Sequence, residues 1–119
     1  MLFSSLKLVE RELGPTHVAA DIGCHSFGTY APFHLGGTCV GYGLGLAMGA
    51  KLAHPEKLCI NVWGDAAIGF TGMDFETAAR EKIPILSILS NNFSMAIELK
   101  VMPVSTDKYR STDISGHYA

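Results

Sequence analysis

The sequence is poor in charged residues. Of its 119 residues, 17% are charged and 48% are hydrophobic, whereas an average domain has roughly 25% charged residues. The formal net charge is −2, the pI is about 6.2, and no basic stripe is visible. This balance argues against a general nucleic-acid surface and against an anionic-membrane surface, so any bound phosphate has to be held at a local site.

Cysteine is also scarce, and no export signal is visible. Cys24, Cys39 and Cys59 are an odd number and form no CxxC pair, which favours reduced thiols in a cytoplasmic protein over a disulfide framework. Residues 1–13 carry several charged side chains among their apolar residues, so they cannot form the core of a signal peptide. We therefore expect a cytoplasmic location.

Residues 22–50 contain no Asp, Glu, Lys or Arg. We reject a membrane span here because the stretch holds eight glycines and Pro32, which predict a loop followed by a close-packed helix. Without a partner, such an uncharged region would expose apolar surface. The pattern therefore predicts a homo-oligomer or a hetero-oligomer.

The hydrophobic pattern predicts a single α/β domain over residues 1–119. Leu2, Leu6, Val9 and Leu13 recur at helical spacing before Gly14 and Pro15 stop the pattern. Further along the chain we predict buried strands and helices in alternation: strands over 17–22, 58–63 and 83–89, and helices over 40–53 and 73–82. This order predicts a three-layer fold, in which helices cover both faces of a parallel sheet. The pattern fades after Asn92, so we expect a sheet truncated at its C-terminal side.

Two polar motifs follow successive predicted strands. Asp65 and Asn92 are separated by 27 positions, enough for a loop, a crossover helix and a strand that returns to the same edge of the sheet. Carboxylate, amide and carbonyl oxygens suit Mg²⁺, which completes its coordination with phosphate oxygens and water. The glycine-rich stretch 64–72 would add backbone N–H groups before a helix starting near Met73. The alternative is that Asp65 caps a helix and Asn92 belongs to a turn.

The combination resembles a known signature. Gly64-Asp65-Ala66, 24 intervening residues and Asn91-Asn92 resemble the cofactor signature of thiamine-diphosphate enzymes, which begins Gly-Asp-Gly and ends Asn-Asn. Residues 36–53 resemble the glycine-rich segment and helix that precede this signature in acetolactate synthases and 2-oxoacid decarboxylases. The resemblance implies the diphosphate-binding, C-terminal domain of such an enzyme.

The resemblance also implies a ligand set. Mg²⁺ would be bound by the Asp65 carboxylate, the Asn92 side chain and the Ser94 main-chain carbonyl. Cofactor contacts would further come from Gly64, Ala66 and Ala67 beside the metal, from the Thr38 main-chain carbonyl at the aminopyrimidine, and from Val40, which would prop the cofactor into its bent shape. An ordinary core position is the alternative for Val40. Ala66 departs from the signature, and its methyl group would weaken binding if that position needs positive φ.

Two further residues are candidates for catalysis. Residues 21–25 and 31–33 resemble the cofactor subunit of indolepyruvate and related 2-oxoacid ferredoxin oxidoreductases, and His25 would lie at a strand exit as a proton carrier. Glu98 follows Ile97, six residues beyond Asn92, where 2-oxoacid decarboxylases carry a proton-handling Glu. The alternatives are a structural histidine and a solvated glutamate.

The activity that the resemblance implies is decarboxylation of a 2-oxoacid substrate, followed by capture of the product by an acceptor. The family's activating Glu belongs to a pyrimidine-binding domain or subunit, and this sequence offers no candidate for it. We therefore expect the isolated chain to be inactive. A non-catalytic cofactor-binding module is the alternative.

Overall fold

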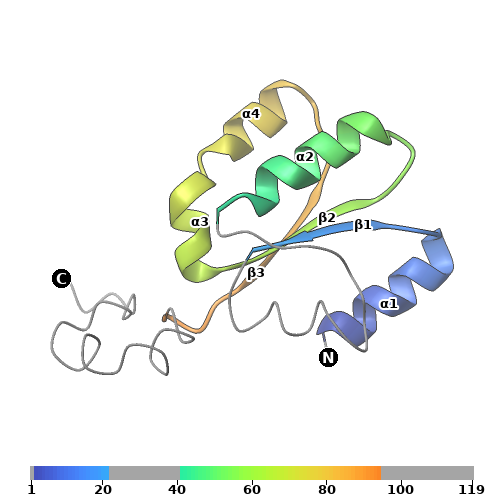
Figure 1. The fold of residues 1–119 in the computed structure, drawn as a ribbon, viewed down its shortest axis with the longest axis horizontal. Coiled ribbons are helices and arrows are strands. Elements are labelled where there is room, and N and C mark those ends of the chain that lie inside the picture. Colours follow the sequence, from blue (N-terminus) through green and yellow to red (C-terminus); the bar gives the residue numbers. More distant parts are fainter. Residues whose placement is uncertain (1, 22–40, 95–119) are drawn as a thin grey trace, which may run out of the picture.

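The computed structural model describes residues 2–21 and 41–94, and Figure 1 shows their arrangement. The elements are α1 (Leu2–Leu13), β1 (His17–Ala20), α2 (Gly43–Ala53), β2 (Cys59–Gly64), α3 (Asp65–Thr71), α4 (Asp74–Arg80) and β3 (Leu86–Ser90). The order of helices and strands is as predicted except between β2 and β3, where two helices, α3 and α4, lie in place of the one predicted. None of the helices within these residues is long and apolar enough to cross a membrane.

The three strands form one parallel sheet in the order β1-β2-β3. Ala19 pairs with Asn61, and Trp63 pairs with Leu89. Crossovers of the usual right hand between neighbouring parallel strands place their helices on one face. In Figure 1, α2, α3 and α4 lie on one side of the sheet and α1 on the other. The predicted α/β fold with covered faces is therefore confirmed.

A hydrophobic cluster lies on each face of the sheet. On the face of α1, Leu6 packs with Ala20, Ile60 and Val62. On the other face, Leu44 of α2 packs with Trp63 of β2 and Ala67 of α3. Residues of β2 therefore pack into the cluster on one face or the other according to the side on which they point, as expected for a strand covered on both faces.

Two predictions about local structure are wrong. Residues 65–71, expected only as part of a glycine-rich stretch before the next helix, form helix α3 themselves. The next helix does begin near Met73, at Asp74. Gly69 lowers the stability of a helix by about 1 kcal/mol. Ala67 and Ile68 nevertheless pack in the hydrophobic cluster between α2 and the sheet, and this tertiary contact keeps the segment helical. Strand β3 is also not buried as predicted: Leu86 and Leu89 are 43% and 45% exposed in this last strand of the sheet that the described residues form.

Candidate functional site

The candidate site lies where the strands end. Asp21 follows β1, Asp65 follows β2, and Asn91 and Asn92 follow β3. Because the strands are parallel and adjacent, these residues lie along one edge of the sheet. Ligands of open α/β sheets bind at this edge.

Asp65 and Asn92 are in direct contact. The Asp65 carboxylate accepts the Asn92 backbone N–H at 2.9 Å through Oδ2, and its Oδ1 accepts the Ala66 N–H at 2.8 Å. Asp65 is half-buried and Asn92 is exposed. A carboxylate offers about four lone-pair directions, so both oxygens of Asp65 keep acceptor capacity for a cation. The tertiary structure thus joins two residues that lie 27 positions apart.

The segment after β3 is a tight polar turn. The Asn92 Oδ1 accepts the Ser94 N–H at 3.2 Å, and the Asn91 Oδ1 accepts the Phe93 N–H at 3.0 Å. Phe93 has a φ of +57°, a left-handed conformation that is costly for an aromatic residue. Both Asn side chains are therefore used in the turn that the sequence also allowed, and the same turn holds Asn92 against Asp65.

Hard oxygen donors dominate this edge. Residues 2–21 and 41–94 contain no group of three His, Cys, Asp or Glu side chains that could hold a metal ion. A cation here would depend on a single carboxylate together with amide and main-chain oxygens. Mg²⁺ commonly binds in this way, since it fills its other positions with phosphate and water.

Gly64, Ala66 and Ala67, the residues next to Asp65, were predicted to contact the cofactor. Gly64 is extended and precedes α3, and Ala66 lies in the first turn of the helix. Ala66 is not among the described residues with positive φ, so its methyl group creates no backbone strain. Ala67 is 4% exposed and packs against Leu44 and Trp63, so its side chain faces the core.

Four predicted site residues lie outside the described residues: His25, Thr38, Val40 and Glu98. Their roles stay predictions. The resemblance of residues 21–25 and 31–33 to ferredoxin oxidoreductases also rests almost wholly on residues outside this part of the chain.

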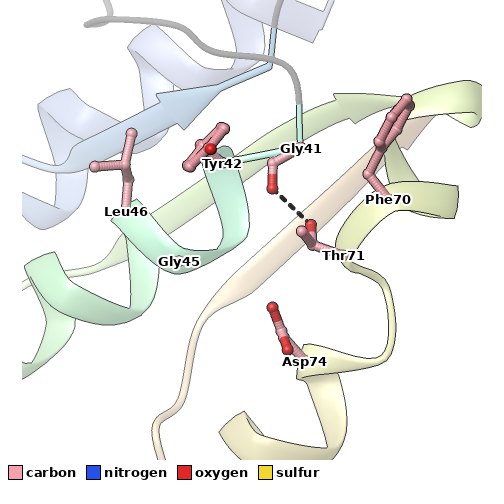
Figure 2. A pocket seen from close by; sticks show the side chains of 7 residues that line it. All are labelled: Gly41, Tyr42, Gly45, Leu46, Phe70, Thr71 and Asp74. Carbon is pink, nitrogen blue, oxygen red and sulfur yellow. Dashed lines mark hydrogen bonds between the residues drawn. The ribbon is translucent and has the colours of Figure 1, made fainter.

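A pocket of about 480 Å³ lies beside the start of α2 (Figure 2). Its walls come from residues 41–46 on one side and from the α3–α4 corner on the other: Gly41, Tyr42, Gly45, Leu46, Phe70, Thr71 and Asp74. The Thr71 hydroxyl donates a hydrogen bond of 2.8 Å to the Gly41 carbonyl across this boundary. The bond connects the end of α3 to the backbone that follows Val40.

A buried polar pair supports the start of α2, and the sequence analysis missed it. Asp21 and Asn61 are both fully buried, and the Asp21 Oδ1 accepts the Gly43 N–H at 3.1 Å. Tyr42 provides no side-chain cap for α2, so Asp21 caps the helix from another element. An asparagine within the apolar run Leu58 to Trp63 was the available signal.

Cys59 lies in β2, and its side chain has no role at this edge. It is free and fully buried, and burial raises the pKa of its thiol. A thiolate nucleophile needs the opposite environment. The expectation of a reduced, buried thiol is therefore confirmed for Cys59.

The chain matches a protein-family model described as "Thiamine pyrophosphate enzyme, C-terminal TPP binding domain" over residues 21–117. The chain belongs to this family. Thiamine pyrophosphate is another name for thiamine diphosphate, so the family membership supports this cofactor, and the α/β fold agrees with it.

Several curated relatives of the chain are acetolactate synthases or 2-hydroxyacyl-CoA lyases. The acetolactate synthase large subunit of Mycobacterium tuberculosis is 38% identical over 60 residues, which cover 50% of this chain and 11% of that protein. The 2-hydroxyacyl-CoA lyase of Saccharomyces cerevisiae is 40% identical over 76 residues, covering 60% and 14%. The 2-hydroxyacyl-CoA lyase 1 of Dictyostelium discoideum is 36% identical over 73 residues, covering 61% and 12%. The matched segments thus span about an eighth of the lengths of these relatives.

Proposed function

We propose that this chain holds thiamine diphosphate through Mg²⁺ at the carboxyl edge of its sheet. The Asp65 carboxylate, the Asn92 side chain and the Ser94 main-chain carbonyl would bind the metal. The observation that carries this proposal is the contact of the Asp65 carboxylate with the Asn92 N–H, which places candidate oxygen donors from two strand ends together. The hard oxygen chemistry of these donors fits Mg²⁺ and a diphosphate.

The other residues of the site would contact the cofactor itself. The backbone of Gly64, Ala66 and Ala67 lies next to Asp65, and Thr38 and Val40 would face the organic part of the cofactor. When bound, thiamine diphosphate supplies the electron sink for making or breaking a carbon–carbon bond next to a carbonyl group. The role of this chain would be to fix the cofactor's orientation and to balance the charge of its diphosphate.

We propose that the enzyme in which this domain acts carries out an acetolactate-synthase-like or decarboxylase reaction on a 2-oxoacid. The acetolactate synthase relatives support this assignment. A 2-hydroxyacyl-CoA is the second candidate substrate, because several similar proteins are named 2-hydroxyacyl-CoA lyases. His25 and Glu98 are the proposed proton-handling residues, and activity assays with the two substrate classes distinguish the candidates.

A pyrimidine-binding domain or subunit would complete the active site in a cytoplasmic oligomer. Support comes from apolar side chains near the pocket, since Tyr42, Phe70 and Met73 are 71%, 67% and 86% exposed. Large exposed apolar side chains gathered in one place are typical of interaction surfaces. If the chain is instead a non-catalytic module, it would bind the cofactor but support no turnover with any such partner.

The proposal is tested by isothermal titration of thiamine diphosphate into the chain, with and without Mg²⁺. We expect Mg²⁺-dependent binding that is lost in Asp65→Ala. Glu12→Ala is the matched control, because Glu12 is an exposed carboxylate of α1, which lies on the other face of the sheet from α3. No binding by the folded wild-type chain, or equal binding by Asp65→Ala, would disprove the site.

A further inference from the structure

The side chain of Asn91 closes the polar turn that follows β3. Its Oδ1 accepts the Phe93 backbone N–H at 3.0 Å. An asparagine that bonds the backbone two residues further along the chain forms a local turn without help from another element. Asn91 is exposed and belongs to neither hydrophobic cluster, so it contributes to the turn through this hydrogen bond.

The residue that Asn91 bonds has an unfavourable backbone conformation. Phe93 has a φ of +57°, in the left-handed region that an aromatic residue rarely adopts. Its side chain is 56% exposed, so packing of the ring offsets little of the conformational cost. The hydrogen bond to Asn91 therefore stabilises a conformation that Phe93 by itself disfavours.

Phe93 also lies between two of the proposed metal ligands. The Asn92 N–H is held by the Asp65 carboxylate at 2.9 Å, and the Asn92 Oδ1 accepts the Ser94 N–H at 3.2 Å. Because Phe93 joins Asn92 to Ser94, its backbone dihedrals set the direction of the Ser94 peptide relative to Asn92. Mg²⁺ requires near-ideal octahedral geometry, with ligands at about 2.1 Å. The conformation of Phe93 thus decides whether these donors fit one ion.

We propose that Asn91 is a positioning residue for the metal site. It binds neither the metal nor the cofactor, and it holds Phe93 in the left-handed conformation that aligns Asn92 and Ser94. The inference rests on the proposed function. Loss of the Asn91 Oδ1 should weaken Mg²⁺-dependent cofactor binding, and a residue that adopts positive φ freely at position 93 should restore it.

The first test is titration of thiamine diphosphate into the full chain at a fixed Mg²⁺ concentration. We expect Asn91→Ala to weaken binding about fivefold, the factor that corresponds to roughly 1 kcal/mol for one hydrogen bond. Asn91→Ser should recover part of the loss, because a serine hydroxyl closes the same kind of turn more weakly. Circular dichroism checks the fold of each variant. If Asn91→Ala does not fold, Asn91→Ser with and without Phe93→Gly replaces it.

A second substitution separates positioning from direct contact. Glycine adopts positive φ without steric cost, so adding Phe93→Gly to Asn91→Ala should restore most of the lost affinity. Adding Lys82→Gly to Asn91→Ala is the matched control. Lys82 is the other described non-glycine residue with positive φ, and it precedes β3, whereas Asn91 follows this strand. The control should bind thiamine diphosphate as weakly as Asn91→Ala alone.

Three results would overturn the inference. Unchanged binding by Asn91→Ala would show that the turn does not need this side chain. A loss that Phe93→Gly fails to recover would assign Asn91 a direct contact with the metal or the cofactor. Recovery by Lys82→Gly would indicate a general effect on stability. A wild-type chain without Mg²⁺-dependent binding would instead disprove the proposed function, and the inference would fall with it.

Discussion

Strands β2 and β3 pair along their length but lie in different surroundings. Five of the six residues of β2 are buried, whereas β3 has no buried residue: two are exposed and three are half-buried. Ile60 of β2 and Leu86 of β3 are register partners, yet Ile60 is fully buried and Leu86 is 43% exposed. Apolar residues in two paired strands thus contribute differently to the free energy of unfolding, because their positions in the sheet bury them to different extents.

The largest expected effect comes from truncating these two partners. We expect Ile60→Ala to lower the free energy of unfolding by about 2–5 kcal/mol, because it removes buried methylene groups and leaves a cavity. Leu86→Ala should cost less than about 1.5 kcal/mol, because its side chain keeps much of its contact with water. Urea denaturation measures both values. A loss at Leu86 as large as that at Ile60 would mean that β3 is covered in solution.

A second pair of variants probes the buried polar layer next to β2. In Gly43→Ala, the new Cβ would lie 2.5 Å from the Asn61 Oδ1 and 2.8 Å from the Asp21 Oδ2, both on fully buried side chains. We expect this variant to lose about 1–3 kcal/mol through overpacking. Gly45→Ala, in the same helix with nothing within 4 Å, should gain up to about 1 kcal/mol from helix propensity. Equal thermal denaturation midpoints for the two variants would contradict this account.

The turn after β3 supplies the third test. Phe93 has a φ of +57° and is 56% exposed, so Phe93→Asn should stabilise the chain by about 1 kcal/mol through relief of backbone strain. Lys82→Asn is the matched variant at another left-handed position, with a φ of +53° and no contact with Asp65. Denaturant midpoints measure both changes. Destabilisation by Phe93→Asn would show that the aromatic ring contributes more than its exposure indicates.

The smallest effect is expected at the ion pair of Lys7 and Glu10 on α1, whose side chains are both half-buried. The hydrogen bond from Lys7 to Glu10, 2.6 Å long, lowers the pKa of Glu10 below its ordinary value of 4.5. A carboxyl whose pKa falls on folding stabilises the chain above that ordinary value. This contribution is lost as the pH falls through the lowered pKa.

Glu10→Gln should therefore cost at most about 0.5 kcal/mol at neutral pH, since the pair is partly exposed to solvent. The cost should disappear in unfolding curves recorded well below pH 4.5. A cost that persists in acid would assign the effect to packing instead of charge.

The fold was largely predictable because hydrophobic periodicity, and the Gly and Pro residues that end a helix or strand, can be recognised within a short stretch of sequence. The spacing of Leu2, Leu6, Val9 and Leu13 predicted α1 with its observed bounds, and the apolar runs predicted three strands in their correct order. Ends of elements were less accurate. The last strand was predicted over 83–89 and lies at 86–90, because Ile83 is buried outside the sheet after Lys82, whose φ is positive.

The candidate site was predictable in part. Two polar motifs after successive strands predicted that Asp65 and Asn92 meet at one edge, and the structure brings them into contact. Their binding of metal and cofactor stays a prediction. No helix was predicted over residues 65–71 because the stretch is rich in glycine, whereas packing of Ala67 on Leu44 and Trp63 makes it helical.

The sequence by itself determined the order of helices and strands, the parallel sheet and the edge at which the polar motifs end, because each follows from residue patterns along a short stretch of chain. Tertiary structure alone decided the burial of Asp21 and Asn61 under Gly43, the exposure of β3 and the hydrogen bond from Thr71 to Gly41. These features join residues from 18 to 40 positions apart or depend on what covers a strand. Only packing in three dimensions brings such groups together.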